Sequence, residues 1–374
     1  MAKKNNMGEI ASVFLKLGFI GFGGPAVHIA MMEEEVVRKR QWFTHEHFLD
    51  LIGATNLIPG PNSTEMALHC GRERGGWRGL LVAGACFILP AVIITGLFAW
   101  AYQKYGQLPQ VQPFIYGIKP AVIGVVVSLM ITLGKKAVKN NTLLVIGLTC
   151  AVLAILRIND IFILFGAGFL AVALFYANKR ISTFNTIAPL FFLPAAAIPG
   201  NFSDWKVFWV FLKVGAILYG SGYVLFAFLD SELVKTGIMS RQTLVDAIAV
   251  GQFTPGPVFS SATFIGWQLG GLPGAAKATV GIFLPSFLFV GLLNPLVSFL
   301  RKSKAMSAFL DAVNVAAIAL IVAVCVEIGR SSVTDWKAGI ILVAGIAVTL
   351  SFRKLNSAFV IIGGALAGYL LWLI

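Results

Sequence analysis

The chain has 374 residues, of which 58% are hydrophobic and only 12% charged, and its formal net charge is +13. Soluble domains carry about a quarter charged residues, so this composition excludes an ordinary soluble globular protein. The basic excess does not indicate a nucleic-acid partner, because Lys and Arg gather in short clusters between apolar runs, as they do in the cytoplasmic loops of membrane proteins. The expected surrounding is a lipid bilayer.

Long apolar stretches that are nearly free of charge follow one another along the whole chain. They occupy residues 82–99, 121–133, 143–156, 161–176, 208–229, 282–293, 313–326, 339–350 and 359–374. A helix needs roughly 20 apolar residues to cross the hydrocarbon core, and several of these runs reach that length with their flanks. The alternation typical of a membrane β-barrel is absent from the sequence. The pattern predicts an all-α integral membrane protein with about 11 to 13 transmembrane or re-entrant helices.

Four short motifs recur in the same order in the two halves of the chain. FLKLGFIGFG at residues 14–23 returns as FLKVGAILYG at 211–220, and Pro-Gly-Pro recurs further along each half. GGWRG then returns as GGLPG, and FILP as FLP, with an offset that stays between 195 and 197 residues. This order and spacing indicate a duplication. They predict a first transmembrane repeat at 1–181, a linker at 182–205 and a second transmembrane repeat at 206–374.

The charges of equivalent loops predict that the two repeats are inverted. In the first copy a loop with one Lys precedes a loop with three, whereas in the second copy the basic loop comes first. Because basic loops remain in the cytoplasm, equivalent loops would face opposite sides, as in many secondary transporters. Residues 186–200 would then cross as an extra span. The N-terminus would be cytoplasmic, and the C-terminus would lie outside.

One basic group conflicts with this topology. Arg38, Lys39 and Arg40 would fall outside the cell unless their loop folds back or residues 14–32 form a re-entrant segment. The N-terminus lacks the apolar region and cleavage site of a signal peptide, so the first helix is expected to direct insertion. We therefore predict a multi-pass protein of the inner, or plasma, membrane.

Interrupted segments stand at matching places in both halves, and they predict the substrate site. The first pair contains glycines, and the second contains Pro-Gly-Pro, which ends one helical turn and begins another. A half-helix that starts inside the membrane directs its amides and its positive dipole end at an anion. Two lysines and the hydroxyl-bearing residues nearby would add donors. The predicted binding residues are Gly23, Gly24, Pro59, Gly60, Pro61, Asn62, Ser63, Thr64, Lys16, Lys213, Gly220, Gly222, Pro255, Gly256, Pro257, Ser260 and Ser261.

The sequence leaves two interpretations open for several charged residues. Lys16 and Lys213 either bind an anion or extend to the membrane interface. Lys119, whose repeat counterpart is Asn314, is better explained as an interfacial anchor. Glu65 either carries a coupled proton or pairs with a base such as Arg72.

Two further acids complete the candidates for ion coupling. Glu33 and its counterpart Asp230 either serve in coupling or stabilise helix ends by pairing with bases such as Arg38 and Lys235. No catalytic residue is predicted, since no acid–base or nucleophile cluster is apparent. No metal site or cofactor is expected, because His45 and His47 would point to different faces of a helix and the four cysteines lack ligand spacing.

The interrupted segments also resemble a known family, the chromate ion transporters. The resemblance rests on FGGP at residues 22–25, EEEVV at 33–37 and NLIPGPNSTEMA at 56–67. In the second half it rests on GQFTPGPV, ATFIG and GIFLPS, so it covers nearly the whole chain. It implies a secondary transporter of chromate, working as an efflux system, with sulfate as the tetrahedral mimic. A homodimer is compatible with this reading.

The hypothesis that combines these observations is an oxyanion transporter that works by alternating access and is driven by an ion gradient. Three alternatives stay open. The first is a transporter of another solute, such as a cation coupled through Glu65. The second is a membrane-embedded enzyme that acts on lipid, and the third is a passive channel.

Overall fold

The computed structural model describes residues 6–22, 24–156, 158–178, 204–219, 224–292, 303–352 and 355–373. These residues form helices joined by short connections, and no strand occurs among them. In the first copy the helices are α1 (Met7–Ile20), α2 (Pro25–Met32), the π-helical η1 (Glu33–Lys39), α3 (His45–Thr55), α4 (Asn62–Tyr105), α5 (Gln112–Ala137), α6 (Asn141–Ile155) and α7 (Asp160–Asn178).

The second copy repeats this order of elements. Its helices are α8 (Asp204–Ile217), α9 (Val224–Leu229), the π-helical η2 (Asp230–Val234), α10 (Arg241–Phe253), the short 3-10 segment η3 (Val258–Ser260), α11 (Ser261–Leu292), α13 (Lys304–Ser332), α14 (Trp336–Ser351) and α15 (Ser357–Trp372). The same kind of N-cap precedes corresponding helices in both copies. Thr44 accepts the amide of His47 at 3.2 Å before α3, and Ser240 accepts that of Thr243 at 3.1 Å before α10.

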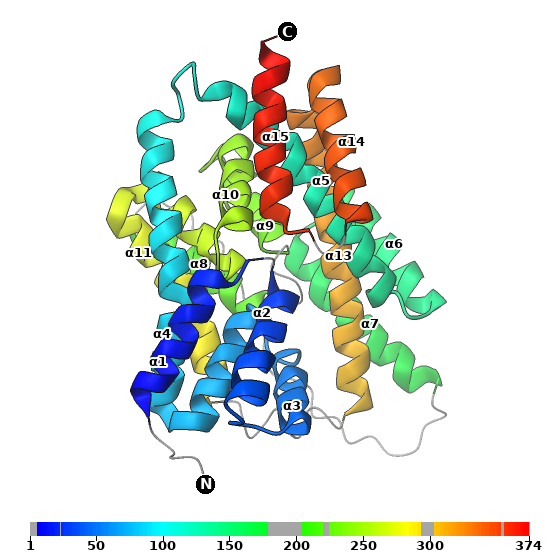
Figure 1. The fold of residues 1–374 in the computed structure, drawn as a ribbon. Helices are drawn as coiled ribbons and strands as arrows, with labels where there is room; N and C mark the ends of the chain where they lie inside the picture. The colour runs from blue at the N-terminus through cyan, green and yellow to red at the C-terminus, as the bar shows by residue number, and fades with distance from the viewer. Residues whose placement is uncertain are drawn as a thin grey trace.

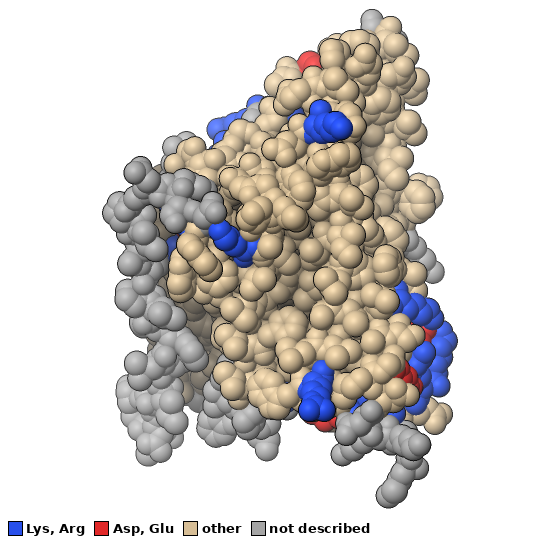
Figure 2. Space-filling model, turned by 90° about the vertical axis from the view of Figure 1, so that its left-hand side faces the viewer, with Lys and Arg blue, Asp and Glu red and all other residues tan. Residues whose placement is uncertain are grey.

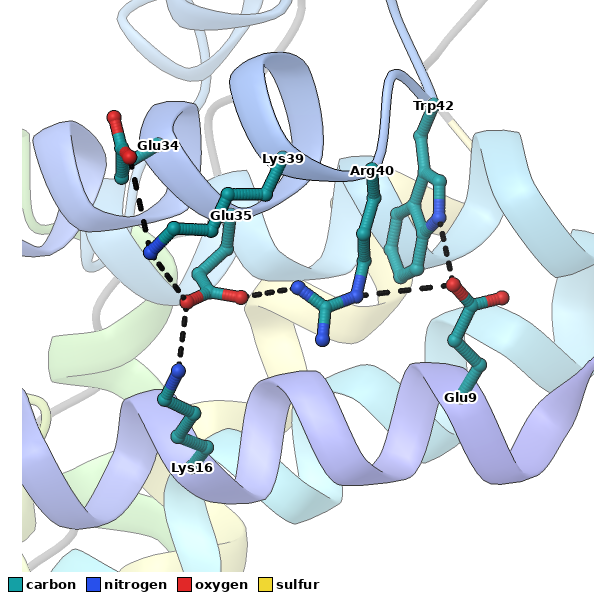
Figure 3. A network of polar contacts seen from close by, with 7 residues as sticks. All are labelled: Glu9, Lys16, Glu34, Glu35, Lys39, Arg40 and Trp42. Atoms are coloured by element: carbon teal, nitrogen blue, oxygen red, sulfur yellow. Dashed lines mark hydrogen bonds and ion pairs between the residues drawn. The ribbon is translucent and has the colours of Figure 1, made fainter.

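The first two helices form a hairpin that returns to the end of the molecule from which it starts. Glu9, near the beginning of α1, pairs with Arg40 at 3.7 Å, just after η1. Further along α1, Lys16 pairs with Glu35 at 2.8 Å. Figure 3 shows these contacts joining two antiparallel segments. The hairpin favours the re-entrant alternative that the sequence left open, because Arg40 lies at the same end as the start of α1.

A second hairpin follows directly and has the same form. His47, at the start of α3, lies 3.7 Å from Glu73, so α3 and the first part of α4 run side by side in opposite directions. The chain then turns at Gly75 and Gly76, where φ of Gly76 is +62°. Glycine reaches this conformation without the steric cost of a Cβ. After the turn, α4 continues as one long helix through Tyr105.

The same geometry recurs in the second copy. Lys213 pairs with Glu232 at 2.7 Å, as Lys16 does with Glu35. Gly271 has φ +58° and ψ −148°, against +62° and −149° at Gly76. The duplication inferred from sequence motifs therefore extends to individual backbone angles.

Two equivalent helices establish that the copies are inverted. The ring of Trp77, where α4 resumes after its turn, lies against Gly291 near the end of α11. At the other end of this part of α4, Gln103 accepts a hydrogen bond of 2.8 Å from Trp267, just before α11 turns. The two segments are related by the repeat and run antiparallel. The start of α1 and the end of α15 accordingly lie at opposite ends of the molecule (Figure 1).

The outer surface suits a hydrocarbon surrounding. Five helices among the described residues are long and apolar enough to cross a membrane, and large apolar side chains such as Leu81, Ile93 and Leu97 on α4 are exposed. Figure 2 shows one broad face almost without charge. The predicted extra span at 186–200 lies outside the described residues and stays a prediction.

Candidate functional site: the junction of four interrupted helices

The four helix breaks meet in two hydrogen bonds that are copies of one another. The amide of Gly60 donates to the carbonyl of Leu218 at 2.8 Å, and the amide of Gly256 donates to the carbonyl of Gly21 at 2.7 Å. Gly60 corresponds to Gly256 and Gly21 to Leu218 in the repeat. Each Pro-Gly-Pro turn is therefore bound to the first break of the opposite copy. We refer to this region as the four-break junction.

Glycine is required at the centre of each Pro-Gly-Pro turn. Gly60 has φ +138° and Gly256 has φ +89°, both in the region that disfavours other residues. A Cβ on Gly60 would also collide with Glu65 Oε1 and lie 2.5 Å from the hydroxyl of Ser286. A Cβ on Gly256 would lie 2.8 Å from that of Ala91. Backbone conformation and close packing therefore act together at these positions.

Helices begin at the junction as the prolines predict. Pro61 is the N-cap of α4, and Pro257 is the N-cap of η3, which continues into α11. No side chain caps either start. The first turn of a helix carries unpaired N–H groups and a partial positive charge, which favours an anion. These two starts come from opposite copies, and both are buried.

Two polar side chains of the junction, those of Glu65 and Ser286, lie beside Gly60. Thr64, Glu65, Ser261 and Ser286 are fully buried, and their side-chain oxygens have no hydrogen-bond partner of good geometry among the described residues. His69 follows Glu65 by one helical turn and is also buried without partners for its ring nitrogens. Buried polar groups are normally satisfied, so an unsatisfied group of this size indicates a place for water, a proton or a ligand.

The two sides of the junction differ in polarity. Beside Gly60 stand a carboxyl and a hydroxyl, whereas the equivalent place beside Gly256 holds Ala91 and the carbonyl of Gly18. Ser260 is fully buried and receives a 3.2 Å hydrogen bond from Thr95 of the other copy. The backbone of the junction is therefore nearly symmetric between the two copies, whereas the side chains beside the two turns differ.

Most predicted binding residues reach the junction, but not all can be placed there. Ser63 and Thr64 are buried in the first turn of α4, while Asn62 binds the side chain of Asn56 at 3.1 Å. Gly24 has φ +84° and precedes Pro25 at the start of α2. Three glycines, Gly23, Gly220 and Gly222, lie outside the described residues.

The two predicted lysines are engaged elsewhere. Lys16 bonds to Glu35 and has a side chain that is 51% exposed, and Lys213 bonds to Glu232. The Lys16 pair belongs to a network in which the carboxylate of Glu35 also forms ion pairs with Arg40 and Lys39 (Figure 3). These contacts join the two arms of each first hairpin. Their positions favour a structural role over a direct contact with substrate.

The three candidate coupling acids differ in their surroundings. Glu33 is partly exposed and pairs with Arg38 at 3.6 Å, as one alternative predicted. Asp230 is fully buried but bonds to Arg241 at 3.0 Å. Glu65 alone of the three is buried without such a partner. The alternative pairing of Glu65 with Arg72 is wrong, because Arg72 donates to the carbonyl of Val290 and lies over the ring of Trp77.

Sequence reasoning missed several polar residues in the interior. Ser286 follows the mid-helix Pro285 and carries no sequence signal other than that position. Lys119 is not an interfacial anchor, since it is 8% exposed and lies 3.8 Å from Asp246. Within the described ranges, no group of three His, Cys, Asp or Glu side chains could hold a metal ion.

The fold and the site together define a multi-pass membrane protein built from two inverted repeats with interrupted helices. The chain matches the chromate transporter family model at residues 8–172 and again at 205–369, and it belongs to that family. It is 32% identical to the chromate transport protein of Cupriavidus metallidurans, covering 96% of this chain and 92% of the relative. It is also 30% identical to a probable chromate transport protein of Synechococcus elongatus, covering 97% and 95%, and no solved structure matches it.

Proposed function

We propose that this protein is a secondary active transporter of a tetrahedral oxyanion, with chromate exported and sulfate as mimic or counter-substrate. The observation that carries the proposal is the reciprocal bonding of four helix breaks, which ties a helix start of each copy to the first break of the opposite copy. Helix starts of this kind bind sulfate-like anions through backbone amides. The family membership and the relatives named as chromate transport proteins support the choice of chromate.

Alternating access follows from inverted symmetry. Two copies that share a fold but face opposite ways can exchange conformations, so a site between them opens first to one side and then to the other. In this structure the Pro-Gly-Pro turns of both copies are buried, which fits a state in which the site is closed to both sides of the membrane. An ion gradient in the plasma membrane drives the cycle in this proposal, and the assembly is a homodimer.

The buried acid at the junction is assigned the coupled proton. A carboxylate buried without a counter-charge costs several kcal/mol, so a proton on Glu65 stabilises the site when an oxyanion is present. The alternative function that a buried acid supports is a cation transporter, in which Glu65 binds the cation directly. Both models give Glu65 an essential role. They differ in whether an oxyanion or a cation crosses the membrane.

Uptake into proteoliposomes separates these models. We expect labelled chromate to accumulate under an imposed proton gradient and to exchange against internal sulfate. Phosphate and nitrate, added as competitors, test whether the site selects its anion by size and by charge. If purified protein transports neither chromate nor sulfate, and neither displaces the other in a binding assay, the oxyanion proposal is refuted.

A further inference from the structure

A second buried charged group lies between the two copies, apart from the four-break junction. Lys119 on α5 points its Nζ at Asp246 Oδ1 on α10, at 3.8 Å. The hydroxyl of Tyr102, near the end of α4, donates to Asp246 Oδ2 at 2.6 Å. Lys119 and Asp246 are only 8% and 4% exposed. Charged residues inside a membrane protein are costly and mark functional positions by default.

The geometry of this pair is incomplete for a structural salt bridge. At 3.8 Å the Lys119–Asp246 contact is longer than a hydrogen bond, and Asp246 Oδ1 has no hydrogen-bond partner among the described residues. Buried ion pairs offset their desolvation only when such bonds are made. By contrast, Arg241 at the start of the same helix bonds to both Asp230 and Glu327. The Lys119 pair is neutral overall but leaves acceptor and donor positions unfilled.

The pair joins the two copies and has no repeat-related equivalent. The acid has a counterpart, Asp50, but the position equivalent to Lys119 is Asn314. Of the charged and titratable groups around Asp246, α4 contributes Tyr102 and α5 contributes Lys119, while Glu327 of α13 and Asp230 of η2 are held by Arg241. Among the described residues, Lys119 is therefore the positive charge that faces the unbonded Oδ1 of Asp246.

The helices that carry the pair lead to the surface on one side and to the junction on the other. Tyr102 is followed by Gln103, whose amide oxygen accepts a 2.8 Å hydrogen bond from Trp267 in an exposed position. On the other side, α10 ends at Phe253, two residues before the second Pro-Gly-Pro turn. Asp246 therefore lies on the helix that leads into that turn.

We propose that Lys119 is a binding residue for the transported oxyanion and that Asp246 is its resident counter-ion, released by taking up a proton when the anion arrives. This inference rests on the proposed function. Oδ1 of Asp246 accepts one proton from solution, and a doubly charged oxyanion replaces Asp246 as the partner of Lys119. No other bond forms or breaks. The protonated Asp246 then becomes a donor to the anion, while Tyr102 keeps the other carboxyl oxygen occupied.

Calorimetric titration of the purified full-length protein with sulfate tests this exchange. Titrations in buffers of different ionisation enthalpy report the protons taken up per anion bound. For the unmodified protein we expect about one proton per sulfate, with affinity that rises on acidification. We expect K119Q to bind sulfate at least about tenfold more weakly. D246N should bind sulfate while taking up about one proton fewer than the unmodified protein.

Two further variants serve as controls for folding and for charge. K139Q removes the lysine of an exposed Lys–Asp pair, which Lys139 forms with Asp311 at 2.7 Å, and should bind sulfate as the unmodified protein does. The double variant K119Q/D246N buries no net charge, so it should fold and yet fail to bind. Unchanged affinity in K119Q, or unchanged proton uptake in D246N, overturns the inference and leaves oxyanion transport intact. If the unmodified protein binds neither sulfate nor chromate, the proposed function fails and this inference with it.

Discussion

Gly60 and Leu218 share a backbone hydrogen bond of 2.8 Å that joins a break of the first repeat to a break of the second. Its repeat-related partner joins Gly256 to Gly21 at 2.7 Å. Because both bonds cross between copies, a relative movement of the copies must stretch or exchange them. In the proposed mechanism, the junction is therefore both the binding site and the point at which conformational change is coupled to binding.

Replacing either central glycine is expected to disable the protein. Gly60→Ala forces a side chain into positive φ and against Glu65, and Gly256→Ala meets Ala91 at 2.8 Å. Backbone strain of this kind costs about 1–3 kcal/mol, before the steric collision is counted. We expect a lower Tm and loss of chromate uptake in both variants. Gly134→Ala, which has no neighbour within 4 Å, is the matched control and should be as stable as the parent or slightly more so. A Gly60→Ala variant with normal Tm and uptake would contradict the role assigned to the turn.

Cysteines at Thr95 and Ser260 should lock the two copies together. The two hydroxyl oxygens are 3.2 Å apart in the buried contact between α4 and η3, a separation compatible with a disulfide after substitution. In a background with the four native cysteines replaced by serine, oxidised T95C/S260C should lose transport and recover it with reductant. The single-cysteine variants control for the substitutions themselves. Full transport by the cross-linked protein would mean that this contact does not change during the cycle.

The charge pair in the first hairpin should behave as a structural contact. Because the half-exposed Lys16 bonds to the buried Glu35 at 2.8 Å, K16E should weaken the hairpin, and the swapped pair K16E/E35K should recover part of that loss. Glu35 also bonds to Arg40 and Lys39, so the recovery in Tm will be incomplete. Sulfate affinity should change less than about twofold in the swapped variant. Loss of binding there would return Lys16 to the substrate site that the sequence suggested.

The sequence predicts the breaks themselves, because proline and glycine act locally on the backbone. Pro61 and Pro257 begin helices as their chemistry requires. The repeat also identifies which positions are equivalent. What it does not contain is the pairing of Gly60 with Leu218, because that depends on how the inverted copies meet in space.

The charged residues show the same limit. Lys119 looked interfacial because it stands beside Pro120 at the start of an apolar run, where lysine often extends to the headgroups. Its partner Asp246 lies in the other copy, so no local pattern links the two residues. Conversely, Lys16 matched Lys213 across the repeat, and the conserved spacing proved to preserve ion pairs with Glu35 and Glu232.

Labelling from opposite sides of the membrane tests the re-entrant hairpins. Arg40 lies beside Glu9, so a cysteine at Arg38 should react with an impermeant reagent from the same side as a tag at the N-terminus. Lys337 lies beside Leu371, near the end of α15, so a cysteine at position 337 should react from the other side. Inside-out and right-side-out vesicles allow the comparison. Reaction of R38C and the N-terminal tag from different sides would show that α1 and α2 cross the membrane as one span.

The decisive variant for coupling is E65Q. Glutamine has the shape of a protonated glutamate and cannot release the proton, so the site remains filled and neutral. We expect E65Q to exchange chromate for sulfate across proteoliposomes, yet to lose at least about tenfold of the accumulation driven by a proton gradient. E73Q is the matched control, because Glu73 lies at the other end of the same half-helix, beside His47 on a partly exposed surface. Gradient-driven accumulation equal to that of the unmodified protein would show that the proton travels elsewhere. Loss of exchange as well would mean that the carboxylate itself binds the transported ion, as the cation model requires.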